Sequence, residues 1–106
     1  MSTQKELREQ MLIAEQNIDL ARAVQRLRES QEFKKVFSNH IFKDYVLGLV
    51  NEMHSHSSES PEYLNIVSEL ESVSRVQAYL NHLIDKGQWS QADLINLKAI
   101  PDSELL

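Results

Sequence analysis

The segment from Phe33 to Met53 constrains the fold most, because its apolar residues recur at helical spacing and then cover nearly the whole circumference. A helix of this kind cannot face water on half its surface, so we expect the other segments to pack around it. Gly48 lies within it, and we expect a close approach of another helix to compensate for a glycine there; tolerance at the surface is the alternative. The expected inward positions are Phe33, Val36, Phe37, Ile41, Val46, Leu49, Val50 and Met53.

The composition favours helices and excludes cysteine chemistry. The 106 residues include two glycines, two prolines and no cysteine. So few glycines and prolines leave little room for hairpin turns. The lack of cysteine excludes disulfides, thiol nucleophiles and cysteine-ligated zinc. The length fits one domain, residues 1–106.

Helix-capping residues divide the chain into segments. Ser2 or Thr3 can cap a first helix, and Ser30 can cap the second. The serine-rich stretch 54–60 reads as a loop that ends in an N-cap before Pro61.

The C-terminal part of the pattern predicts one more break. A long third helix is expected to stop at Gly87. Ser90–Asp93 then resembles a capping box that opens a short fourth helix, and residues 101–106 form a tail that either docks or covers the core. The predicted fold is therefore all-α, an antiparallel helical hairpin or small bundle of three long helices plus a short C-terminal helix.

The first helix carries a narrow seam with 4-3-4 spacing that predicts self-association. Its members are Leu7, Met11, Ala14 and Ile18. A chain this small has no obvious helix to cover the seam, and its first residues, 1–12, are expected to project. We therefore predict a homo-oligomer interface at these four positions.

Charge is distributed unevenly along the chain, whose net charge is −5. Residues 22–43 have a net charge of +4, whereas residues 44–106 have −7. This asymmetry favours head-to-tail association or one basic face for a partner or nucleic acid. The phenylalanines nearby fit a buried stripe better than a base-stacking platform, so nucleic acid is the less favoured partner. The candidate contact residues are Arg22, Arg26, Arg28, Lys34 and Lys35.

No motif in the chain predicts catalysis, a metal site or a cofactor. His54 and His56 lie in the polar loop without enough further ligands for zinc. His40 and Asp44 are one helical turn apart, as in an ordinary surface pair. No phosphate-binding or HExxH pattern occurs. No apolar run is long enough to span a membrane or form a signal peptide, so we expect a soluble protein that is not exported.

The pattern IDLARAVQRLRESQEFKKVFSNHIFKDYVLGLV, followed by a polar break and IVSELESVSRVQAYLNHLIDKGQWSQADL, resembles small helical proteins commonly encoded by tailed bacteriophages. The similarity covers most of residues 18–97. Many proteins of this group have no assigned function, so the resemblance implies a viral accessory or virion-associated role and transfers no catalytic residue.

These observations favour a nonenzymatic helical protein that acts through protein–protein contacts, as an oligomeric structural or assembly component of a phage particle. Its expected partners are copies of itself and another phage or host protein. The alternative is a small phage protein that handles DNA or inhibits the host through the basic stretch from Arg22 to Lys43.

Overall fold

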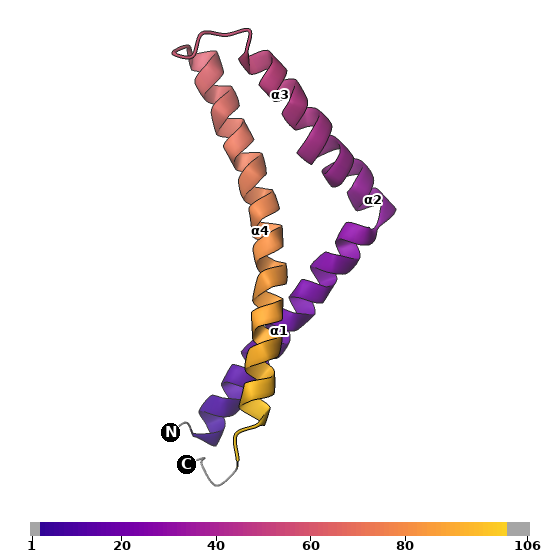
Figure 1. The fold of residues 1–106 in the computed structure, drawn as a ribbon, viewed down its shortest axis with the longest axis vertical. Coiled ribbons are helices and arrows are strands. Elements are labelled where there is room, and N and C mark those ends of the chain that lie inside the picture. Colours follow the sequence, from indigo (N-terminus) through magenta and orange to yellow (C-terminus); the bar gives the residue numbers. More distant parts are fainter. Residues whose placement is uncertain (1–2, 102–106) are drawn as a thin grey trace. The chain divides into compact units, whose positions relative to one another are not determined.

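The structure is a computed structural model that describes residues 3–101, and most of these residues lie in helices. The helices in chain order are α1 (Gln4–Glu29), α2 (Gln31–Phe33), the π-helix η1 (Lys34–Tyr45), α3 (Val46–Met53) and α4 (Pro61–Lys98) (Figure 1). No strand occurs among these residues, which confirms the predicted all-α class. The tail residues 102–106, for which docking was predicted as one alternative, lie outside the described range.

The helices divide into two compact units. The terminal unit comprises residues 1–26 and 81–106, and the middle unit comprises Leu27–Leu80. Each unit contains two helical segments, one from each half of the chain. Its core can therefore form on only one side of each segment.

Side-chain caps begin three of the helices where the sequence predicts them. At α1, Glu6 N–H donates to Thr3 Oγ1 at 3.1 Å and Thr3 N–H donates to the Glu6 carboxylate at 3.3 Å. Ser30 Oγ accepts from Phe33 N–H at 3.2 Å, and Ser60 Oγ accepts from Tyr63 N–H at the same distance. These bonds satisfy amide groups that lack helical partners. The caps at Ser30 and Ser60 are thereby confirmed, and of the two candidates Thr3 caps α1.

The expected break near Gly87 is wrong. Helix α4 continues from Pro61 to Lys98, and the predicted capping box at Ser90–Asp93 lies inside it. Gly87 has no positive φ, which a C-terminal glycine cap would require. The short C-terminal helix is therefore the last part of α4.

Small residues bring the two helices of the terminal unit together. Gly87 is buried, and a Cβ added to it would lie 2.2 Å from Ala21 Cβ and 3.4 Å from the Asn17 carbonyl oxygen. Only glycine fits at such a separation. One turn further along α4, Ser90 Oγ accepts a hydrogen bond from Asn17 Nδ2 at 3.1 Å. The helices run antiparallel here, because Ala21 lies beside Gly87 whereas Ala14 and Leu97 line one groove.

Aromatic rings pack the middle unit, and the π-helix determines which ones face inward. Backbone bonds in a π-helix join residues five apart, so positions four and five apart share a face. The Phe33 and Phe37 rings stack with centroids 4.8 Å apart, and those of Phe37 and Phe42 lie 5.9 Å apart. Val36, which a spacing of 3.6 places inward, is instead 47% exposed. A π-helix of twelve residues is unusually long.

The central segment Gln31–Met53 is not the element around which the chain packs, contrary to expectation. Phe33 and Leu49 are buried in it, while the other predicted inward residues are half-buried or exposed. Gly48 has no atom within 4 Å of where a Cβ would lie, so the predicted close helix approach is wrong there. Ile66 of α4, one turn before Glu69, is buried in the same unit. The hydroxyl of Tyr45 also donates to the Glu69 carboxylate.

Candidate interaction surfaces

The predicted oligomer seam on α1 is covered within the chain. Leu7, Ala14 and Ile18 are buried and Met11 is half-buried. Residues 81–98 of α4 belong to the same unit as the seam and cover it. This partner was not predicted because a helix break was expected at Gly87. The reason for placing an interface at these four residues is therefore wrong, because α1 already has a helix beside it within the chain. Leu7 lies in the stretch 1–12 that was expected to project, and it is buried.

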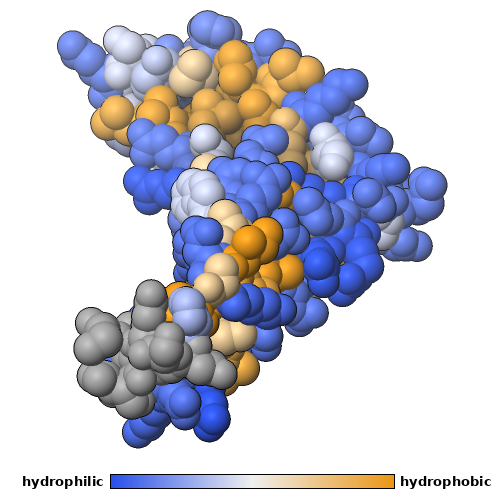
Figure 2. All heavy atoms as spheres, turned by 60° about the horizontal axis from the view of Figure 1, so that its bottom comes forward, coloured by the Kyte–Doolittle hydropathy of each residue, from blue (hydrophilic) through white to orange (hydrophobic). Residues whose placement is uncertain are grey.

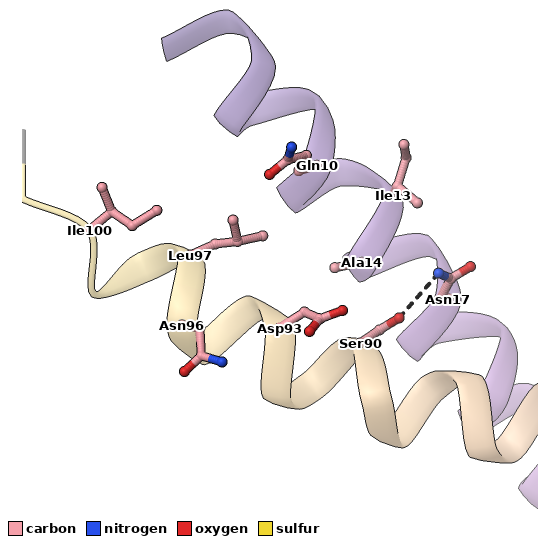
Figure 3. Close-up of a pocket in the computed structure, with 9 residues that line it drawn as sticks. All are labelled: Gln10, Ile13, Ala14, Asn17, Ser90, Asp93, Asn96, Leu97 and Ile100. Carbon is pink, nitrogen blue, oxygen red and sulfur yellow. Dashed lines mark hydrogen bonds between the residues drawn. The ribbon is translucent and has the colours of Figure 1, made fainter. Parts of the chain in front are cut away.

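A groove opens between the two helices of the terminal unit. It has a volume of about 620 Å³, and its apolar lining includes Ala14 and Leu97, which project into the space between the helices (Figure 3). The Asn17–Ser90 hydrogen bond lies at one end of the groove and Ile100 lies at the other end. Amide and carboxylate groups complete the lining. The full set is Gln10, Ile13, Ala14, Asn17, Ser90, Asp93, Asn96, Leu97 and Ile100.

The lining of this groove is better suited to binding an apolar side chain than to catalysing a reaction. Its polar members are amides, a hydroxyl and one carboxylate, which can orient a ligand through hydrogen bonds. No nucleophile–base pair of the kind used in covalent catalysis is formed by these nine residues. The groove is thus a candidate contact surface.

The basic residues predicted as partner contacts are mostly exposed. Arg22 and Arg26 lie on the outer side of α1, and Lys34 and Lys35 lie on η1, all exposed to solvent. Arg28 is half-buried near the end of α1. Arg22 and Arg26 belong to the terminal unit, whereas Arg28, Lys34 and Lys35 belong to the middle unit.

The aromatic residues next to the basic stretch do not form an exposed platform. Phe33 is buried, and Phe37 and Phe42 are half-buried against one another. Stacking of nucleic-acid bases requires accessible ring faces. The rings serve the core of the middle unit instead.

A second apolar hollow lies in the middle unit, with a volume of about 310 Å³. Val36 and Leu80 contribute to its lining together with the edge of the phenylalanine stack. Leu27, at the end of α1, also lines it and is about half exposed.

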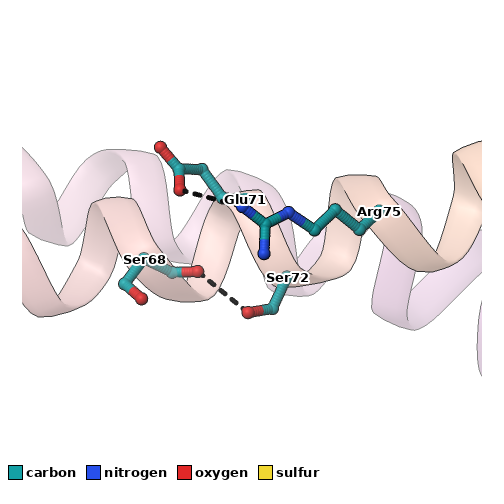
Figure 4. A network of polar contacts seen from close by, with 4 residues as sticks. All are labelled: Ser68, Glu71, Ser72 and Arg75. Carbon is teal, nitrogen blue, oxygen red and sulfur yellow. Dashed lines mark hydrogen bonds and ion pairs between the residues drawn. The ribbon is translucent and has the colours of Figure 1, made fainter.

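Polar surface side chains on α4 make local contacts only one turn apart. Arg75 pairs with the Glu71 carboxylate at 4.0 Å, and the Ser72 hydroxyl donates to the Ser68 carbonyl oxygen at 3.0 Å (Figure 4). Both contacts are exposed, so they contribute little to stability. They are typical of a solvated helix face.

The histidines do not gather into a metal centre in the described part of the chain. No group of three or more His, Asp or Glu side chains there could hold a metal ion. His54 and His56 lie in the loop before Ser60, and His40 and Asp44 line a shallow hollow beside Gly48. The His82 ring meets the exposed Trp89 ring edge-on at 6.2 Å.

The structure also bears on membrane association. Among residues 3–101, none of the helices combines the length and the apolar character needed to cross a bilayer.

Comparison with protein-family models, with characterised proteins and with solved structures gives no significant match.

The contacts that sequence reasoning missed are those made by small residues. Ala14, Asn17 and Ala21 recur at spacings of three and four on α1, and Gly87 and Ser90 recur at a spacing of three on α4. Facing rows of small residues allow two helices to approach closely. That signal was present, but Gly87 was interpreted as a helix end.

Proposed function

We propose that this protein is a nonenzymatic helical protein that acts through protein–protein contacts, first with copies of itself, as a structural or assembly component of a phage particle. The observation that supports this most is incomplete burial. No large side chain within residues 3–101 is fully buried, and apolar residues reach the surface of both units (Figure 2). A pair of helices leaves each core open on its outer sides, which association closes.

The phage setting, in the host cytoplasm or in the virion, rests on the resemblance of residues 18–97 to small phage proteins. A further phage or host protein is part of the proposal, because one self-contact covers only one of the open faces. The exposed apolar side chains provide the surfaces for such contacts. The largest of them are Leu12, Ile13, Leu20, Leu27, Val36, Leu47, Leu64, Val76, Tyr79, Trp89 and Ile95.

Molar mass in solution tests the proposal. Light scattering over a wide range of protein concentration should show a mass of at least twice that of one chain. A mass that stays at one chain at the highest concentration would contradict self-association.

The alternative function is DNA handling, and exposure of Arg22, Arg26, Lys34 and Lys35 favours testing it. The same measurement with added duplex DNA separates the two. Binding driven by phosphate contacts weakens steeply as salt increases, whereas apolar association does not. Loss of a complex with DNA on raising salt, without any self-association at low salt, would favour the alternative.

A further inference from the structure

Helix α1 exposes apolar side chains on the side that faces away from its partner helix. Ala14, Ile18 and Ala21 face inward and are buried, whereas Leu12 is 54% and Leu20 is 47% exposed. Leu12, Gln16 and Leu20 follow one another at intervals of four, so they form one row along the helix. This outer row has no counterpart inside the terminal unit.

Charged side chains accompany the row in a specific order. Two acids one turn apart, Glu15 and Asp19, precede two arginines one turn apart, Arg22 and Arg26. All four are exposed, and within residues 3–101 none of them forms an ion pair with another side chain. Each acid lies seven residues before an arginine, which places the four on the same side of the helix.

We propose that this outer face of α1 pairs antiparallel with the same face of α1 in a second copy of the chain. A two-fold axis between Leu20 and Ala21 places Glu15 of one copy opposite Arg26 of the other. The same axis places Asp19 opposite Arg22, and symmetry repeats both pairs. A parallel arrangement would instead place acids beside acids. The order of charges thus selects both the occupant and its direction.

The apolar row and the charges have different roles in this contact. The two Leu20 side chains meet next to the axis, and burial of Leu20 and Leu12 provides the affinity. Exposed ion pairs contribute little affinity, but facing like charges oppose the wrong orientation. The proposal rests on the self-association proposed above and specifies its surface.

Charge reversal tests the pairing in a way that permits rescue. Replacing both arginines (Arg22→Glu, Arg26→Glu) makes the face acidic, and replacing both acids (Glu15→Arg, Asp19→Arg) makes it basic. Each variant alone should associate at least about tenfold more weakly, because like charges then face each other. A mixture of the two variants should form mixed dimers. The chain with all four changes should associate as the natural sequence does, because its charge order is reversed and still complementary.

A matched control carries the same change in net charge elsewhere. Lys86→Glu with Lys98→Glu alters exposed residues of α4 and should leave the association unchanged. Circular dichroism checks that every variant keeps its helices. An equal loss in this control, or no rescue in the mixture and the fourfold variant, would overturn the charged pairing.

Cysteine cross-linking tests the direction, since the chain contains no cysteine of its own. Leu20→Cys lies beside the axis and should give a disulfide-linked dimer under mild oxidation. Two copies of Leu12→Cys would lie about 25 Å apart in the antiparallel pair and should not cross-link. Cross-linking of both variants would indicate a parallel pair, and would refute the proposal. Association of the natural chain without sensitivity to any of these changes would refute this surface but leave self-association intact, whereas a strict monomer would refute both.

Discussion

Helical segments pack against each other in both the terminal and the middle unit, but with opposite kinds of side chain. The contact is made by small residues in the terminal unit and by large aromatic residues in the middle unit. The terminal unit closes around Gly87 and Ala21, where no further carbon atom fits. The middle unit fills its space with the Phe33–Phe37–Phe42 stack and leaves Gly48 without neighbours. The contact in the terminal unit depends on the short distance between the two helix backbones. The contact in the middle unit depends on the volume of the phenylalanine rings.

This difference teaches how each unit should respond to mutation. A close helix contact tolerates removal of atoms better than addition, because extra atoms force the helices apart. A contact built from large rings responds in the opposite way, because removing a ring leaves a cavity that the surroundings fill only partly. Variants that add or remove carbon atoms in each unit therefore separate the two modes of packing.

Removal of the Phe33 ring should have the largest effect. Phe33 is buried and stacks on Phe37, so Phe33→Ala should lower the free energy of unfolding by about 3 kcal/mol. Phe37→Ala should lower it by about half as much, because that ring is only half-buried. Urea denaturation followed by circular dichroism measures both values. Equal losses would show that the π-helix does not set the burial of these rings.

Hydrogen exchange locates the effect of the Phe33 change. Faster amide exchange should be confined to the middle unit, residues 27–80. Equally faster exchange around Gly87 would show that the two units unfold together. The two units would then differ in how they pack but would not unfold independently of each other.

Addition of one methyl group at the close contact should have the next largest effect. Gly87→Ala should lower the free energy of unfolding by about 1 to 3 kcal/mol, although alanine favours helices by about 1 kcal/mol. The reason is the 2.2 Å separation between the added Cβ and Ala21 Cβ. Thermal and urea denaturation measure the change.

A second substitution makes the Gly87 prediction specific. Ala21→Gly removes the carbon atom that the new methyl group meets, so it should restore part of the stability in the double variant. A double-mutant cycle gives the coupling between the two positions. Independent, additive effects would mean that the helices do not approach closely at this point.

The helix starts could be predicted from the sequence because they depend on neighbouring residues. Thr3 and Ser30 bond to amides three residues ahead, and Ser60 does the same before α4. Such bonds form whatever the rest of the chain does. The serine-rich loop 54–60 could be predicted for the same reason.

The sequence could not show where another helix approaches. Glycine is compatible with a helix end, a close contact or an open surface, and only the tertiary structure separates these uses. Gly87 was expected to end a helix and makes the close contact, whereas Gly48 was expected to make a close contact and lies open. For the same reason, the interface of α1 was predicted on a face that α4 covers, because the sequence does not show which face of α1 another helix contacts.

The π-helix η1 was not predicted from the sequence, for a different reason. A pattern of apolar residues is interpreted with a period of 3.6, and η1 does not follow that period. Val36 was therefore assigned to the core, although the structure exposes it. Spacings of four and five between Phe33, Phe37 and Phe42 were the available signal.

Addition of a methyl group at the other glycine should have the smallest effect and the opposite sign. Gly48→Ala should raise the free energy of unfolding by about 0.5 to 1 kcal/mol, because alanine loses less conformational entropy in a helix and no atom within 4 Å opposes its Cβ. The same denaturation measurements compare it directly with Gly87→Ala, which adds the same atoms to the other unit. Destabilisation at Gly48 as well would mean that something packs closely on α3 in solution. Because the single chain leaves that position open, loss of stability that grows with protein concentration would then identify a second copy as the neighbour.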